Sequence, residues 1–175
     1  MTKLSGIVRR VDGLGRVVIP KEIRKVLKIK ENEQVEINVV DDTITLNKYT
    51  DIHENDKSIT NLINSLKDIF NKDIIITSLS KIVLATKDYK DYLDLELSPY
   101  LVNIIENRKD INELLPEYLS LSNLKESIKV AFSIRTLIIN GDTIGLVILL
   151  TNSSLENSDL KVLDFLNNYL ENYLE

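Results

Sequence analysis

A polar segment at residues 50–57, TDIHENDK, most constrains the fold because it separates two regions of different pattern. It has no apolar periodicity, whereas regular apolar spacing lies on both sides of it. We therefore predict one domain over residues 1–50 and another over residues 58–175, joined by a linker over residues 51–57. His53, the single histidine of the chain, falls in this linker, where we expect a solvated side chain rather than a metal ligand.

The charge of the chain also differs between the two regions. Residues 1–50 hold ten Lys and Arg against seven Asp and Glu, whereas residues 51–175 hold twelve against twenty. The first thirty residues alone carry nine basic and two acidic side chains. A basic module of this kind favours a polyanionic partner, and a solvated basic surface without a partner is the alternative.

Composition argues against several other classes of protein. With 43% apolar and 28% charged residues, the chain is typical of soluble globular proteins. It has no apolar run long enough to span a membrane and no N-terminal secretion segment, so we expect a cytoplasmic protein. The absence of cysteine excludes disulfides and a catalytic thiol. Without a metal-ligand set or a nucleophile with its base, we predict no metal, no cofactor and no enzymatic activity.

The first domain is predicted to have the order ββαββ. Gly13 and Gly15 permit the positive backbone angles of a tight turn, and Pro20 suits the start of a helix. Apolar residues at alternate positions indicate the strands. The predicted elements are strands at residues 4–10 and 16–19, a helix from Pro20 to about Lys28, and strands at residues 34–40 and 43–48.

Fifty residues of this pattern are too few to close a core alone. A domain of this size buries only about 60% of the surface that its unfolded chain exposes, and isolated hairpins are marginal in water. Interleaving the hairpins of two chains would cover the sheet edges and close a β-barrel. We therefore predict an intertwined homodimer through residues 1–50.

Basic side chains gather on one face of the short helix and on both sides of the glycine turn. Like charges at helical spacing repel one another unless an anionic partner is present. Arginine suits such a partner because its planar guanidinium can hold a phosphate, or the O6 and N7 edge of guanine, at two points. We expect Lys21 and Lys28 to be merely solvated. The arginines for which we favour contact are Arg9, Arg10, Arg16 and Arg24.

The stretch over residues 6–24, GIVRRVDGLGRVVIPKEIR, closely resembles the swapped-hairpin DNA-binding domain of the AbrB and SpoVT families of transcription regulators. The resemblance to the SpoVT family extends past the linker, where residues 90–93 and 140–145 are similar to its C-terminal GAF domain. It implies a regulator of sporulation genes in the forespore, both activator and repressor, that binds double-stranded DNA on the nucleoid.

The resemblance also implies roles for single residues. In these families the DNA-contacting arginines lie at the positions that Arg9, Arg16 and Arg24 occupy here, with Arg10 and Lys25 assisting. Lys25 departs from the family pattern, and a lysine keeps the charge but loses the fork, which disfavours a base contact. The alternative in the same superfamily is an antitoxin that neutralises a toxin with a short disordered tail, but this chain is patterned to its end.

The second region, residues 58–175, is predicted to form one α+β domain. The pattern of residues 109–125, interrupted by Pro116, does not discriminate between helix and strand. The predicted elements are a helix at residues 58–70, strands at 73–79 and 81–86, a helix at 98–107 opening at Ser98-Pro99, strands at 128–139 and 143–150, and a C-terminal helix after a capping box at Ser153-x-x-Glu156.

The GAF resemblance leaves two roles open for this domain, sensing of an unidentified small molecule and assembly. Cyclic-nucleotide binding is disfavoured because the signature motif is absent, and we expect Tyr89, Tyr92, Tyr100 and Tyr118 to pack in the core or at its rim. On the C-terminal helix, apolar residues repeat as in a coiled coil. We favour contact of this stripe with a second subunit over packing on its own sheet, which would give a homotetramer. The stripe consists of Leu163, Leu166, Leu170 and Tyr173.

Overall fold

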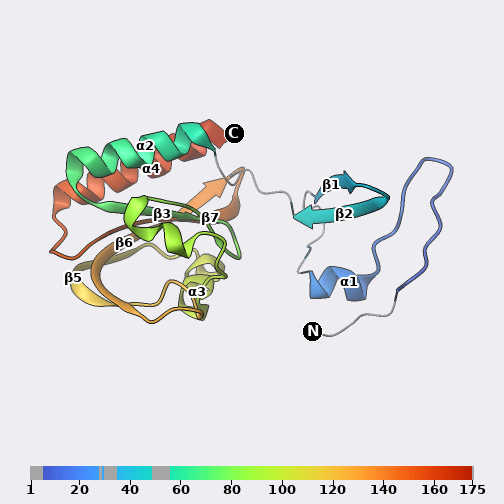
Figure 1. Ribbon diagram of the computed structural model, residues 1–175, viewed down its shortest axis with the longest axis horizontal. Helices are drawn as coiled ribbons and strands as arrows, with labels where there is room; N and C mark the ends of the chain where they lie inside the picture. Colours follow the sequence, from blue (N-terminus) through green and yellow to red (C-terminus); the bar gives the residue numbers. More distant parts are fainter. Residues whose placement is uncertain (1–5, 28, 30–34, 49–55, 175) are drawn as a thin grey trace. The chain divides into compact units, whose positions relative to one another are not determined.

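A computed structural model describes residues 6–27, 29, 35–48 and 56–174 of the chain (Figure 1). The chain divides into two compact units, Met1–Tyr49 and Thr50–Glu175, and each is described by itself. The predicted linker falls largely outside the described residues, as do His53, Lys28 and the start of the first predicted strand. Within the described ranges, no helix is long and apolar enough to cross a membrane.

The N-terminal unit contains a short helix and a hairpin. Helix α1 (Lys21–Val26) confirms the predicted helix, although Pro20 lies at its N-cap rather than at its first helical position. The second predicted hairpin is confirmed as β1 (Val35–Val40) and β2 (Thr43–Lys48), which pair antiparallel. Asp41 turns the chain between them with a φ of 52°.

The first predicted hairpin has its turn but not its strands. Residues 6–10 and 16–20 adopt no regular secondary structure, although the Asp12 N–H donates to the Arg16 carbonyl at 3.1 Å across the turn. The prediction of strands at residues 4–10 and 16–19 is therefore wrong for the described part of a single chain. The physical reason is that these segments lie beside no other described strand, so no ladder of hydrogen bonds forms.

The N-terminal unit leaves most of its described aliphatic side chains exposed. The exposed fraction of these large apolar residues ranges from 37% for Leu46 to 88% for Val8. Pro20 is the one buried residue in the described part of this unit. A single copy therefore has no closed core of its own. The exposed residues are Ile7, Val8, Val11, Leu14, Val17, Val18, Val26, Leu27, Ile37, Val39, Val40, Ile44 and Leu46.

The C-terminal unit is built on a five-stranded antiparallel sheet in the order β4-β3-β7-β6-β5. The region that the sequence did not assign contains the edge strand β5. Its register with β6 shifts between Glu113 and Glu117, around Pro116, which has no N–H to donate and is tolerated at an edge. The strands are β3 (Asp73–Thr77), β4 (Ile82–Ala85), β5 (Ile111–Leu119), β6 (Ile128–Ile139) and β7 (Asp142–Thr151).

Helices cover both faces of this sheet (Figure 1). Helices α2 (Lys57–Phe70) and α4 (Asn157–Leu174) lie side by side on one face, packed on Ile74 and Ile76 of β3. The short helix η1 (Lys87–Tyr92) and α3 (Pro99–Asn107) cover the other face, where Ile75 lies. Because both faces are covered, all five residues of β3 are buried. The predicted α+β class is confirmed, with helices packed on an antiparallel sheet.

The capping box predicted before the C-terminal helix is wrong. Helix α4 begins at Asn157, and the carboxylate of Asp159 accepts a hydrogen bond from the Glu156 N–H at 2.9 Å. The hydroxyl of Ser153 instead lies 3.2 Å from the hydroxyl of Thr151. The hydrogen bond at this helix start therefore comes from an acidic residue inside the first turn and not from the serine of the predicted capping box.

The leucine stripe of α4 is occupied by its own domain. Leu163, Leu166 and Leu170 are fully buried in the core shared with α2 and the sheet. The preference for contact between these leucines and a second subunit is therefore wrong. Tyr173, the fourth member of the stripe, is exposed. A helix face buried this completely leaves no area for a partner, so any assembly through α4 has to use another face.

Candidate nucleic-acid interface

One carboxylate organises the turn between residues 12 and 16. The Oδ1 atom of Asp12 accepts from the N–H groups of Leu14 and Arg16, both at 2.9 Å, and its Oδ2 atom accepts from Nε of Arg16 at 2.8 Å. Gly15 has a φ of 79°, which requires the conformational freedom of glycine. The backbone N–H and then the guanidinium of Arg16 hold the pKa of Asp12 below its ordinary value.

Arg16 is anchored at one edge and free at the other. Because Nε is paired with Asp12, the two terminal nitrogens of the guanidinium remain available as donors. Its side chain is 72% exposed. The turn therefore presents a charged, partly fixed guanidinium fork to solvent.

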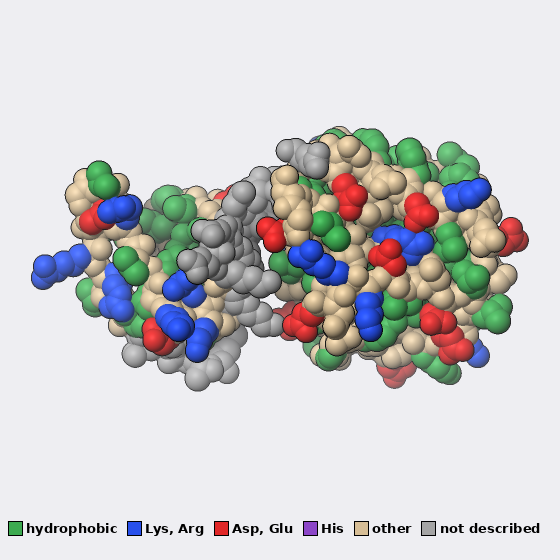
Figure 2. All heavy atoms as spheres, turned by 180° about the vertical axis from the view of Figure 1, so that it is seen from behind, with side chains coloured by type: hydrophobic (Ala, Val, Ile, Leu, Met, Phe, Trp, Pro, Cys, Tyr) green, Lys and Arg blue, Asp and Glu red, His purple; other side chains and the backbone are tan. Residues whose placement is uncertain are grey.

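The five candidate residues come from three segments. Arg9 and Arg10 precede the turn, Arg16 closes it, and Arg24 and Lys25 lie on α1. All except Arg24 are exposed. Figure 2 shows Lys and Arg side chains gathered over the N-terminal unit, with few acidic side chains among them. Such a surface can hold phosphates, and its arginines have the fork that reads a guanine edge.

Arg24 differs from the other four because part of its guanidinium is enclosed. Its Nε atom is buried and has no hydrogen-bond partner among the described residues. A buried hydrogen-bond donor without an acceptor lowers the stability of the fold, and such groups are rare in folded proteins. An acceptor from a second copy of the chain or from DNA would remove that cost.

The other candidate sites, for a metal ion or a ligand cage of tyrosines, have less support in the described residues. Among the described residues, no group of three or more His, Cys, Asp or Glu could hold a metal ion. Tyr89 and Tyr92 pack at the rim of the core beside α3, with ring centroids 5.8 Å apart, and burial raises the pKa of Tyr89 to about 12. Tyr100 and Tyr118 are exposed, so the expectation of core or rim packing is wrong for those two.

Phe165 and Tyr169, whose side chains widen the apolar surface of the C-terminal helix in the sequence pattern, form an aromatic ladder with Tyr173 on the outer face of α4, a grouping that the sequence did not predict. These side chains are 40% to 57% exposed. The rings of Tyr169 and Tyr173 stack with centroids 5.9 Å apart, and those of Phe165 and Tyr169 lie 6.4 Å apart. Their spacing of four residues was the available signal, but the overlapping leucine stripe was chosen in its place.

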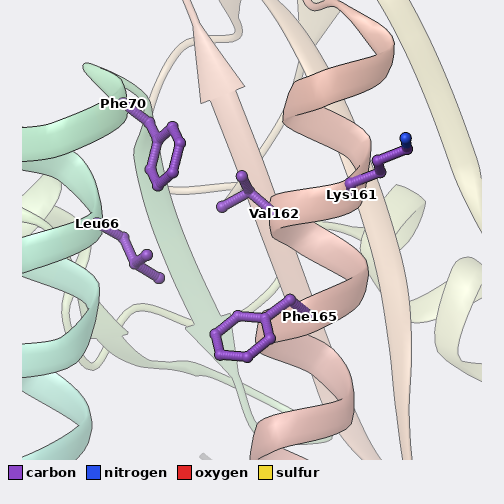
Figure 3. Close-up of a pocket in the computed structure, with 5 residues that line it drawn as sticks. All are labelled: Leu66, Phe70, Lys161, Val162 and Phe165. Carbon is purple, nitrogen blue, oxygen red and sulfur yellow. The ribbon is translucent and has the colours of Figure 1, made fainter.

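An apolar hollow lies beside this ladder, between α2 and α4 (Figure 3). Leu66 and Phe70 point into it from α2, and Val162 and Phe165 from α4, whereas the amine of Lys161 points away. The lining contains no polar surface. The hollow is therefore suited to an apolar group rather than to a polar metabolite.

Two sequence-family models match the chain. The model described as antidote-toxin recognition MazE, bacterial antitoxin, matches residues 8–52. The model described as stage V sporulation protein T C-terminal, transcription factor, matches residues 54–175. The antitoxin model thus covers the N-terminal part alone, and the antitoxin alternative has less support than a transcription regulator.

Individual proteins agree with this division. Stage V sporulation protein T of Bacillus subtilis (strain 168) is 34% identical over 149 residues, which cover 84% of each chain. Transition state regulatory protein AbrB of the same organism is 57% identical over 47 residues, which cover 27% of this chain and 49% of that protein.

A likeness among solved structures concerns the fold alone. A methyl-accepting chemotaxis protein, residues 122 to 287, matches with 16% identity and a TM-score of 0.50, over 67% of this chain and 86% of that one. The match in sequence is more informative, since one family model spans more than half of the chain and one relative spans most of it. The chain belongs to the stage V sporulation protein T family of DNA-binding sporulation transcription regulators.

Proposed function

We propose that the chain regulates sporulation genes, as activator and repressor in the forespore, by binding duplex DNA as an intertwined dimer of its N-terminal units. Arg9, Arg16 and Arg24 contact the DNA, and Arg10 and Lys25 assist. The domains are residues 1–50 and 58–175, joined by residues 51–57, and the protein works in the cytoplasm on the nucleoid. The observation that carries the proposal is a basic surface on a unit whose apolar side chains are exposed.

The exposed aliphatic side chains support dimerisation. Removing apolar surface from water contributes about 25 cal/mol per Å², and the N-terminal unit leaves thirteen large apolar side chains at least 37% exposed. Interleaving two copies would bury them, give the segments at residues 6–10 and 16–20 strands to pair with, and offer acceptors to Arg24. The dimer also doubles the number of cations on one surface, which raises the attraction for phosphates.

Arginine substitutions test the DNA contacts. We expect the triple variant Arg9→Ala, Arg16→Ala, Arg24→Ala to bind duplex DNA at least about a hundredfold more weakly, because it loses forked contacts and released counterions on both chains. Lys21→Ala is the matched control, since it removes one charge from an exposed position on the same helix; we expect a loss of about threefold or less. Fluorescence anisotropy in a salt series measures both, and unchanged affinity of the triple variant would refute the contacts.

For the C-terminal unit we propose assembly through the aromatic ladder, which joins two N-terminal dimers into a tetramer. The ladder and Phe70 flank an apolar hollow, and a second copy of the same face brings rings to fill it. Aromatic pairs contribute about 0.5–1.5 kcal/mol beyond the area that they bury. Two joined dimers bind paired DNA sites more tightly than one dimer does, because the second contact becomes intramolecular.

Charged substitutions on the ladder test this assembly. We expect Phe165→Glu with Tyr169→Glu to convert tetramers to dimers in light scattering, because four added charges would face one another across the interface. Leu124→Glu is the control, since it introduces the same charge at a position that is 72% exposed outside the ladder. A ladder variant with the mass of the wild type would contradict this role, and thermal-shift screens with amino acids and nucleotides would then test the alternative, a small-molecule effector.

A further inference from the structure

An acidic residue lies at the centre of the basic turn. Asp12 is one of two acidic residues in the first thirty, and its carboxylate takes three hydrogen bonds, two of them from Arg16. The pair is exposed, with side chains 72% and 43% accessible, so it adds little to folding stability. A carboxylate here also repels phosphates. The negative charge of Asp12 therefore opposes the general attraction for DNA, and the exposed ion pair compensates with little stability.

The geometry gives the carboxylate another task. An arginine held at Nε loses freedom about its long side chain, and its two terminal nitrogens then point outward as a fork. That fork is the edge that pairs with O6 and N7 of guanine. A fork that is already oriented loses less conformational entropy on binding, so base contacts gain more than phosphate contacts do.

We propose that Asp12 is a positioning residue that sets the sequence specificity of DNA binding by fixing the guanidinium of Arg16. This inference rests on the proposed contact between Arg16 and DNA. The carboxylate has opposite effects on two affinities: it lowers the affinity for non-specific DNA and raises the affinity for the preferred sequence. Asp12 itself touches no base and acts through Arg16.

The variant Asp12→Asn isolates the carboxylate charge. The amide oxygen of asparagine can still accept from the N–H groups of Leu14 and Arg16, so the turn is retained, but the anion that holds Nε is lost. The full-length protein is measured on two probes, a random duplex and a duplex selected by the wild type from a random pool. We expect affinity for the random duplex to rise by about twofold to fivefold, and the ratio of selected to random affinity to fall by roughly tenfold.

Two controls show whether a change in the ratio of selected to random affinity depends on the pair of Asp12 and Arg16. Asp42→Asn removes the same charge from the turn between β1 and β2, and we expect it to leave the ratio unchanged. In an Arg16→Ala background, Asp12→Asn is expected to leave the ratio unchanged as well, because no guanidinium remains to be positioned. An Asp12→Asn protein with the wild-type ratio, or one whose ratio falls equally with and without Arg16, would overturn the proposal.

These variants distinguish the positioning role of Asp12 from the proposed contact between Arg16 and DNA. If Arg16→Ala binds both duplexes like the wild type, the contact between Arg16 and DNA is wrong. If Arg16→Ala weakens binding but Asp12→Asn keeps the ratio, only the positioning role is wrong. Circular dichroism checks the fold of each variant. Should Asp12→Asn fail to fold, Asp12→Glu decides, since glutamate keeps the charge but moves the carboxylate relative to Nε of Arg16: a lowered ratio supports the proposal and an unchanged ratio overturns it.

Discussion

The two units of the chain differ in where their apolar side chains lie. In the C-terminal unit, helices cover both faces of the sheet, and strand β3 is buried along its whole length. In the N-terminal unit, Val8 and Val18 are 88% and 74% exposed, and the described residues include one hairpin without a covering layer. The C-terminal unit therefore has a core within one chain, whereas the described part of the N-terminal unit does not.

The residues that build a complete core and the residues whose chemistry indicates a function therefore lie in different units. The N-terminal unit carries residues whose chemistry points to DNA, but its described apolar side chains are mostly exposed. The C-terminal unit carries a complete fold, but its polar residues mainly serve that fold. Lys67, for example, bridges Asp73 and Asp88 at 2.6 and 2.9 Å and so ties α2 to the sheet and to η1.

The largest effect is expected from a pair of glycines, one in each unit. A Cβ atom on Gly145 of β7 would collide with the backbone carbonyl of Thr77, whereas one on Gly13 would meet no atom within 4 Å. We expect Gly145→Ala to lower the free energy of unfolding by about 3 kcal/mol, because two strands must separate. Gly13→Ala should stay within about 0.5 kcal/mol. Chemical denaturation measures both, and equal losses would contradict the difference in packing between the units.

A smaller effect tests whether the exposed valines become buried in a dimer. Val18→Ala removes two methyl groups, which contribute about 1.5 kcal/mol if the side chain is enclosed by a second copy. In a unit that stays monomeric, the same change at an exposed site should cost less than about 0.5 kcal/mol. Melting at several protein concentrations distinguishes the two cases, with Lys21→Ala as the surface control on the neighbouring helix.

Much of the C-terminal fold was predictable because its signals are local. The apolar stripe of α2, the Ser98-Pro99 start of α3 and the alternation of β6 and β7 each lie within one element. Strand β5 was not recognised because Pro116 and its exposed glutamates hide the alternation of an edge strand. The capping box failed because Ser153 and Asp159 both satisfy the local rule, and the structure uses Asp159.

The candidate site was predictable in its residue types but not in its geometry. The arginines stand in a recognisable motif, whereas the predicted strands of the first hairpin are absent from the described residues. The hydrogen bond between Arg16 and Asp12 was not predicted because it depends on the direction of the Arg16 side chain. The aromatic ladder was missed because buried leucines and exposed rings interleave along α4, and only packing shows which of them faces the sheet.

The smallest effect concerns pH and is confined to the C-terminal unit. Burial, with nearby Asp73, Tyr92 and Asp88, raises the pKa of Tyr89 from 10.0 to about 12. The folded state therefore holds the phenolic proton of Tyr89 more tightly than the unfolded state does. The stability that comes from this difference is complete below pH 10 and is lost as the pH rises from 10 to about 12. Tyr89→Phe should flatten this part of the stability profile, as followed by denaturation and phenolate absorbance. A profile identical to that of the wild type would refute the shift.

The central claim is that the N-terminal unit completes its core and its DNA surface only by pairing with a second copy. Sedimentation equilibrium of a fragment of residues 1–52 at micromolar concentration, with melting recorded over a range of concentrations, tests it most directly. We predict a dimer whose melting temperature rises with concentration, because folding and association are one step. A folded monomer with a melting temperature independent of concentration would contradict the claim.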